Sequence, residues 1–147
     1  MKLTSFLEKT KVFLFRKITE FFGLVVIIFS ILILIAIASY SPNDPNFLIN
    51  KSDNINNWLG FRGSVTSDFI FQSIGIISYL IPFTLFFSGL NIMLLKKPII
   101  IIDGLFFCTL YILFGSLFFS FFKEQSFFLI INGNGGFVGQ FLKESYL

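Results

Sequence analysis

The sequence predicts an all-α, polytopic integral membrane protein with three transmembrane helices, and two observations carry that prediction. Hydrophobic residues make up 55% of the 147 positions and charged residues only 13%, compared with about 25% charged residues in ordinary soluble domains. The apolar residues are gathered into three long runs. Each run reaches the roughly 20 residues that a helix needs to cross a bilayer, within which every backbone group must be paired internally.

Residues 1–20 form a basic tail in which Leu and Phe recur at helical spacing. Two interpretations stay open: a short amphipathic helix lying on the membrane surface, or a frayed tail whose only role is to orient the chain. The positive-inside rule places this end in the cytoplasm in either case. The cations that set this orientation are Lys11, Arg16 and Lys17.

The first transmembrane helix is expected over residues 21–40, because the run from Phe21 to Ala38 carries no charge. The triplet Ala36-Ile37-Ala38 has the small-x-small form of a signal-peptide cleavage site. The basic leader is long, however, and the apolar core exceeds the usual 7–15 residues, so we expect an uncleaved anchor. The helix should end at the following Ser-Tyr-Ser-Pro-Asn-Asp-Pro segment, since proline and Asn-Asp disfavour helix there.

Residues 41–68 are expected to form a polar loop on the periplasmic side of the membrane. This segment is rich in Asn and Asp and lacks the cationic bias of the N-terminus. Trp58 is expected either to rest at the headgroup level, where amphipathic rings favour the interface, or to contact a partner. Gly60 and Gly63 predict a tight bend before the next helix.

The second transmembrane helix is expected over residues 69–95, with Pro82 near its middle, where proline removes a hydrogen bond and bends the axis. The carbonyl that this frees needs a partner, and Ser78, one turn back, is a candidate. Thr84, Ser88 and Asn91 form a polar stripe on the same helix. We favour interhelical hydrogen bonding over a substrate path for this stripe, because no ionisable residue joins it.

Residues 96–98 form a short cytoplasmic turn whose cations, Lys96 and Lys97, agree independently with a cytoplasmic N-terminus. The third transmembrane helix is expected over residues 99–122. Residues 123–147 are expected to form a periplasmic loop leading to a fourth helix that is missing after Leu147. A chain that ends in this way is expected to be a fragment of a longer protein, although a native short protein stays an alternative.

The residue types present predict no catalytic, cofactor-binding or metal site. The chain has no histidine and one cysteine, Cys108, so the commonest general base and metal ligand is missing. Asp103 is the one acid inside an apolar run, and intramembrane acids are functional candidates. It stands only about 7 Å along the helix from Pro98, so it can reach the interface or pair with Lys96 or Lys97. A proton-relay role is the alternative.

An ordered series of motifs resembles the four-helix membrane domain at the N-terminus of the FtsK/SpoIIIE family of bacterial DNA translocases. The series begins with the Ser-Tyr-Ser-Pro-x-Asp-Pro exit and continues through Asn-x-x-Gly-x-x-Gly to Tyr-Leu-x-Pro. The positions that carry it are Ser41, Pro42, Asp44, Pro45, Asn57, Gly60, Gly63, Asp68, Gly75, Tyr79 and Pro82. The likeness covers roughly residues 20–142. Ser64 and Ser67 depart from it, since the family usually has Ala at these positions.

The resemblance implies a membrane-anchoring and assembly role in bacterial cell division and chromosome segregation. It implies a multi-pass protein of the bacterial inner membrane, placed at the division septum, that holds an ATP-driven DNA motor absent from this chain. The expected partners are membrane lipid, further copies in a homo-oligomer, and other division proteins. No cofactor is expected in this chain, and ATP, Mg and DNA would be bound only through the missing motor domain, which makes the full-length protein an ATP-dependent DNA translocase.

Two other classes fit the composition. A small transporter or channel subunit would require ionisable residues facing a cavity, and Asp103 is the one candidate. A stand-alone membrane interaction protein would be complete with three spans.

Overall fold

The computed structural model describes residues 2–45, 54–122, 129 and 131–146 of the chain. In these ranges the chain consists of helices joined by turns and short connections. Three helical segments are long and apolar enough to cross a membrane: Leu7–Ala38, Gly60–Leu95 and Ile100–Phe122. The predicted all-α class, with three transmembrane segments, is therefore confirmed.

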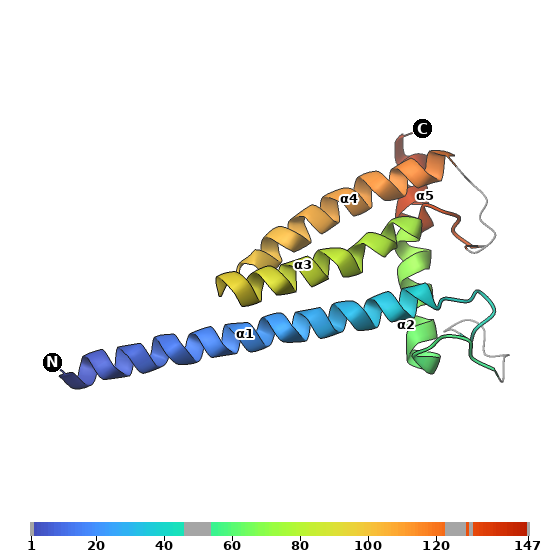
Figure 1. The fold of residues 1–147 in the computed structure, drawn as a ribbon. Coiled ribbons are helices and arrows are strands. Elements are labelled where there is room, and N and C mark those ends of the chain that lie inside the picture. The colour runs from blue at the N-terminus through green and yellow to red at the C-terminus, as the bar shows by residue number, and fades with distance from the viewer. Residues whose placement is uncertain (1, 46–53, 123–128, 130, 147) are drawn as a thin grey trace.

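The first helix, α1 (Lys2–Ala38), runs without interruption through both the expected basic tail and the expected first span. Its 37 residues make it about 55 Å long. The sequence from Lys2 to Ala38 holds no Pro to break the helix, and Lys17 pairs with Glu20 one turn away, Nζ to Oε2, at 2.7 Å. Figure 1 shows that the N-terminal part of α1 extends well beyond the ends of the neighbouring helices.

The segment expected as one helix over 69–95 is divided in the structure. Helix α2 (Gly60–Ile74) is followed by a 3₁₀ helix, η1 (Gly75–Tyr79), and then by α3 (Leu80–Leu95). Helix α2 lies across the ends of α1 and α3 rather than alongside them (Figure 1). The change of direction occurs at Gly75, whose φ of 74° is a left-handed conformation that glycine adopts at little cost.

Pro82 is the third residue of α3 rather than the middle of a span. Proline is tolerated in the first turn of a helix, where its missing N–H would have no intrahelical partner. The Ser30 hydroxyl donates to the buried Pro82 carbonyl at 2.6 Å. Ser78 does not take the role expected of it, because its buried hydroxyl has no hydrogen-bond partner among the described residues.

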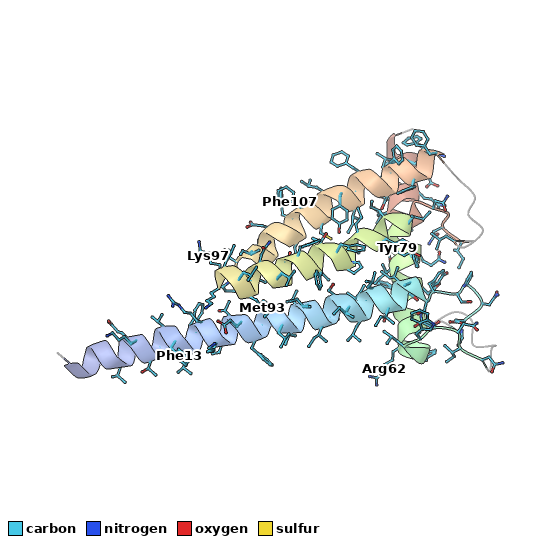
Figure 2. All side chains as sticks on the ribbon, viewed as in Figure 1. Phe13, Arg62, Tyr79, Met93, Lys97 and Phe107 are labelled. Carbon is cyan, nitrogen blue, oxygen red and sulfur yellow. The ribbon has the colours of Figure 1, made fainter. Side chains whose placement is uncertain are left out.

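Helices α1 and α3 lie side by side and antiparallel, and small residues bring their backbones together (Figure 1). A Cβ atom added to Gly89 would come within 2.9 Å of the Gly23 carbonyl oxygen, and one added to Gly23 would come within 2.8 Å of the Gly89 oxygen. Figure 2 shows Met93 in the same contact between the two helices. Close approach through small residues is how helices associate in lipid, where apolar side chains find no hydrophobic advantage in one another.

Helix α4 (Ile100–Phe122) packs against α3, and the polar stripe of α3 takes part in the contact. The Thr84 and Tyr111 hydroxyls lie 3.0 Å apart and share a hydrogen bond. The Ser88 side chain fills the space beside Gly104. Two members of the stripe thus make interhelical contacts, while Asn91 is exposed.

Helix α5 (Gly136–Tyr146) packs against the end of α4 and against α2. Gly139 lies directly on the Ser116 backbone, and the Ser116 hydroxyl donates to the Ile74 carbonyl at 2.8 Å. An apolar cluster of Ile33, Ile37, Phe71 and Leu129 fills the space between the end of α1 and α2. Helices α2 and α5 therefore form a cap across the ends of α1, α3 and α4, and we refer to this end of the molecule as the α2 end (Figure 1).

Candidate functional site at the α2 end

The segment that leaves α1 makes a tight turn before it reaches α2. The Asp44 N–H donates to the Ser41 carbonyl at 3.2 Å, which closes a four-residue turn. Pro42 occupies the second position of that turn, where its fixed φ is favourable. The turn directs the Asp44 side chain toward the start of α2.

The Asp44 carboxylate is buried, with 1% of the residue exposed. Its Oδ1 accepts from the Asn56 backbone N–H at 3.0 Å and from the Asn56 side-chain amide at 2.9 Å. Its Oδ2 accepts from the Asn57 backbone N–H at 2.8 Å. A buried charge requires such donors to replace water, so the three bonds fix the 54–59 segment beside the turn.

Asn57 joins the end of α1 to the beginning of α2. Its side-chain amide N–H groups donate to the Ala36 carbonyl at 2.9 Å and to the Ser39 carbonyl at 3.3 Å. Its side-chain oxygen accepts the Leu59 N–H at 3.0 Å. Gly63, one turn into α2, lies so close that a Cβ atom there would overlap the Asn57 side chain. This close contact explains Asn57 and Gly63 in the Asn-x-x-Gly-x-x-Gly spacing. The middle glycine, Gly60, has a φ of 63°, and its N–H donates to the Asn57 carbonyl at 2.8 Å.

The two serines that depart from the resemblance both make hydrogen bonds within this contact. The Ser64 hydroxyl donates to the Pro45 carbonyl at 2.8 Å, and the Ser67 hydroxyl donates to the Ser64 carbonyl at 3.0 Å. Ser67 also accepts a long bond of 3.5 Å from the Asn57 amide. These hydroxyls are satisfied, so they add hydrogen bonds where alanine would add none.

An aromatic cluster supports the other face of α2. The Tyr40 and Phe71 rings lie 4.8 Å apart between centroids, and the Phe71 and Tyr79 rings lie 5.4 Å apart. The Tyr40 hydroxyl donates to an Asp68 carboxylate oxygen at 3.2 Å. Burial, and then the negative charge of Asp68, raise the pKa of the Tyr40 hydroxyl above its ordinary value. The hydroxyl therefore keeps its proton and its role as donor.

The remaining motif glycine closes the cap. Gly75 lies against the backbone of residues 134–136, where a Cβ atom would overlap the Asn134 carbonyl. The next N–H, that of Ile76, donates to the same carbonyl at 2.9 Å. The α2–η1 corner is thus bound directly to the turn that precedes α5.

The structure therefore brings together the motif residues from Ser41 to Gly75 at the α2 end and assigns their polar atoms to contacts that hold the chain in shape. It leaves Pro82 further along α3, bonded to α1. The described residues contain no group of three His, Cys, Asp or Glu side chains arranged to hold a metal ion.

The model of the family described as the 4TM region of DNA translocase FtsK/SpoIIIE matches residues 16–147. The chain belongs to the FtsK/SpoIIIE family. A protein named DNA translocase FtsK from Rickettsia bellii is 38% identical over 55 residues, which are 37% of this chain and 7% of the relative. Two further proteins of that name, from Rickettsia prowazekii and Rickettsia typhi, are 34% and 33% identical over 64 residues, which are 44% of this chain and 9% of each relative.

The matched segments thus span under a tenth of the length of these curated relatives. No solved structure matches the chain. The residues that form the Asp44–Asn57 contact, the α2 helix and the cap all lie inside the range that the FtsK/SpoIIIE family model covers.

In this FtsK/SpoIIIE membrane region, the cap carries several exposed aromatic side chains. Trp58 is 77% exposed, and it is joined by other exposed rings on α2 and α5. These rings belong to Phe61, Phe69, Phe137 and Phe141, and we call them, with Trp58, the aromatic rim. Arg62 points away from the bundle beside the rim (Figure 2). Rings exposed at the end of transmembrane helices suit the headgroup level of a bilayer or a protein partner.

The five cations predicted to set the topology lie at the opposite end. The sequence allowed an ion pair between Asp103 and Lys96, but Lys96 does not form it in the structure. Its Nζ pairs instead with Glu20 Oε1 at 3.0 Å, because the antiparallel packing of α1 on α3 brings Glu20 to the end of α3. Asp103 is exposed on the first turn of α4 and makes no ion pair within the described part of the chain.

Sequence reasoning did not single out Ser30, Asn56 or the role of Glu20. Each acts across a sequence separation of 12 residues or more, so no local pattern marks it. Gly23 could have been found, because it is the single glycine in a run of large apolar residues, and such a residue indicates close helix packing.

Proposed function

We propose that this chain is the membrane-anchoring and assembly domain of a DNA translocase that acts in bacterial cell division and chromosome segregation. The observation that carries the proposal is the family match over residues 16–147, whose motif residues form one hydrogen-bonded frame in the structure. In this proposal the chain performs no chemistry. It holds an ATP-driven motor, which would bind ATP, Mg and DNA outside this chain, at the septum.

The proposed topology places the N-terminus of α1 and the Lys96–Lys97 turn in the cytoplasm and the α2 end on the periplasmic side of the inner membrane. The positive-inside rule supports this placement, since Lys11, Arg16, Lys17, Lys96 and Lys97 lie at one end of the bundle. A reporter inserted beside Asn54 should be exported, and one inserted beside Lys97 should stay in the cytoplasm. The reverse result would contradict the topology.

The proposed partners at the α2 end are other copies of the chain and other division proteins, which the aromatic rim would contact. The cap supports this role because three elements hold it in place: the Asp44–Asn57 bonds, the Tyr40 cluster and the α5 contact. A surface that is fixed before binding loses little conformational entropy when a partner docks.

Fluorescence microscopy of dividing cells tests the septal role. The full chain fused to a fluorescent protein at its N-terminus should concentrate at mid-cell. Asp44→Ala, which removes the acceptor for three donors, should spread the signal over the whole membrane at equal expression. The matched control Asp103→Asn should concentrate like the unmodified chain. Uniform membrane signal from the unmodified chain would contradict septal assembly.

The motor is tested separately by reading the gene beyond codon 147. We expect a further apolar span and, later, a Gly-x-x-x-x-Gly-Lys-Ser/Thr loop, which cradles nucleotide phosphates. A stop codon at position 148 of the natural gene would contradict the tether and favour a stand-alone interaction protein.

A further inference from the structure

A groove opens at the end of the molecule opposite the aromatic rim, where α1 passes the turn between α3 and α4. Helix α3 ends at Leu95 and α4 begins at Ile100. Glu20 of α1 lies beside this turn, and α1 extends from Glu20 for some 18 residues toward its N-terminus, which is about 27 Å. Figure 2 shows Lys97 on this turn and Phe13 on the extension of α1. Between this turn and the face of α1 that carries Lys11, Phe15 and Arg16 lies a groove of about 470 Å³.

Four cations line the groove: Lys11 and Arg16 from α1, and Lys96 and Lys97 from the turn. Two acids lie nearby: Glu20 is already engaged by Lys17 and Lys96, and Glu8 lies on the adjoining face of α1, outside the groove lining. Lys11, Arg16 and Lys97 have no carboxylate within ion-pair distance among the described residues. The groove therefore carries a positive charge that the described protein does not neutralise.

The remaining walls are apolar. Val12 and Phe15 line the groove from α1, and Leu95 lines it from α3. Leu94, next to it, is 75% exposed, and Ile99 is 59% exposed at the start of the next span. Exposed apolar side chains thus stand on both sides of the Lys96–Lys97 turn, at the ends of the two membrane-spanning helices.

The position of the groove favours one class of anionic ligand over others. It lies where two spans end, and the end of a span is the headgroup level of the bilayer. A nucleic acid requires cations spread along several consecutive phosphates, whereas these cations are gathered in one groove. A soluble anion would gain no binding energy from the apolar walls. A phosphodiester headgroup with attached acyl chains fits both parts, and basic pockets between transmembrane helices are known to bind such headgroups.

We propose that the groove binds the phosphodiester headgroup of an anionic phospholipid, with the phosphate between Lys11, Arg16 and Lys97 and the acyl chains along Leu94 and Ile99. The lipid would fill the angle between the extension of α1 and the α3–α4 turn. This proposal depends on the membrane-spanning helices and not on the presence of a motor.

Native mass spectrometry of the full chain in neutral detergent tests the proposal, with phosphatidylglycerol as the probe and phosphatidylcholine as the zwitterionic comparison. The unmodified chain should retain phosphatidylglycerol in preference to phosphatidylcholine. The pair Lys11→Gln and Lys97→Gln, which leaves the Glu20 ion pairs intact, should weaken phosphatidylglycerol binding about fivefold for each cation removed. The matched pair Arg62→Gln and Lys143→Gln removes the same charge at the α2 end and should leave the preference unchanged.

A charge-conserving pair, Lys11→Arg and Lys97→Arg, distinguishes lost charge from lost structure, since it should keep the preference. Equimolar inorganic phosphate should leave the lipid bound, because phosphate lacks acyl chains. The proposal is overturned if the unmodified chain binds the two lipids equally, if the glutamine pair keeps its preference, or if inorganic phosphate displaces the lipid.

Discussion

The two ends of the helix bundle are held by different kinds of interaction. At the α2 end a buried carboxylate, Asp44, and a buried amide, Asn57, are bound by backbone and side-chain groups at defined distances. At the other end, which we call the lysine end, charged side chains are exposed and one carboxylate, Glu20, joins two lysines. Buried, satisfied polar groups specify one geometry, whereas exposed ion pairs contribute little to stability.

The comparison agrees with the different roles that we propose for the two ends. The α2 end has a fixed shape that suits recognition by a protein, since its hydrogen bonds lose energy if any partner moves. The lysine end has an unneutralised charge that suits orientation in the membrane and contact with a headgroup. Substitutions at the α2 end should therefore change stability more than substitutions at the lysine end.

The largest effect is expected from Asp44→Ala. Three donors would lose their acceptor inside the protein, and each unsatisfied buried donor costs about 1–3 kcal/mol. Allowing for relaxation, we expect a loss of about 3 kcal/mol in the free energy of unfolding, measured by denaturation of the chain in detergent. Asp103→Asn, an exposed carboxylate, should change it by less than about 0.5 kcal/mol. Equal effects of the two variants would remove the distinction between the ends.

A smaller effect is expected from Gly89→Ala, at the middle of the α1–α3 contact. The added methyl group would meet the Gly23 carbonyl oxygen at 2.9 Å. This oxygen belongs to the helix backbone, so it cannot move away as a side chain could. Overpacking of this kind costs about 1–3 kcal/mol. In the control Gly115→Ala the two closest atoms are Cδ1 and Cγ1 of the Ile77 side chain, which can move, and Ile77 Cβ follows at 3.2 Å, so the loss should be smaller. Thermal unfolding in detergent would rank the two variants.

Tyr40→Phe tests the hydroxyl at the α2 end without removing the ring. Loss of the bond to Asp68 should cost about 1 kcal/mol at pH 7. The folded state raises the pKa of Tyr40, so this stabilisation is fully present below the ordinary tyrosine pKa, about 10, and is lost as pH rises above it. Unfolding measured between pH 7 and pH 11 should show a steeper decline for the unmodified chain than for Tyr40→Phe. Parallel declines would contradict the assignment.

The sequence sufficed for the helical class and the number of spans, because hydropathy over some 20 residues reports directly on contact with lipid. It did not predict that α2 would lie across the bundle, since that direction depends on Asn57 reaching Ala36 and on Gly75 meeting Asn134. Both contacts join residues more than 20 positions apart. It also placed Pro82 in the middle of a helix, because apolar composition alone does not distinguish a 3₁₀ segment and a new helix from one continuous span.

The smallest effect is expected at Lys96, whose backbone at φ 57° and ψ 34° is left-handed and ends α3. Glycine adopts this conformation freely, whereas residues with a Cβ atom pay about 1 kcal/mol. The free energy of unfolding of Lys96→Gly should therefore be close to that of the unmodified chain. Lys96→Ala loses the same ion pair to Glu20 and should be less stable than Lys96→Gly by about 1 kcal/mol. The difference between the two variants isolates the backbone from the charge. If both were destabilised alike and strongly, the Lys96–Glu20 pair would be holding the lysine end in place, and the contrast between the two ends would fail.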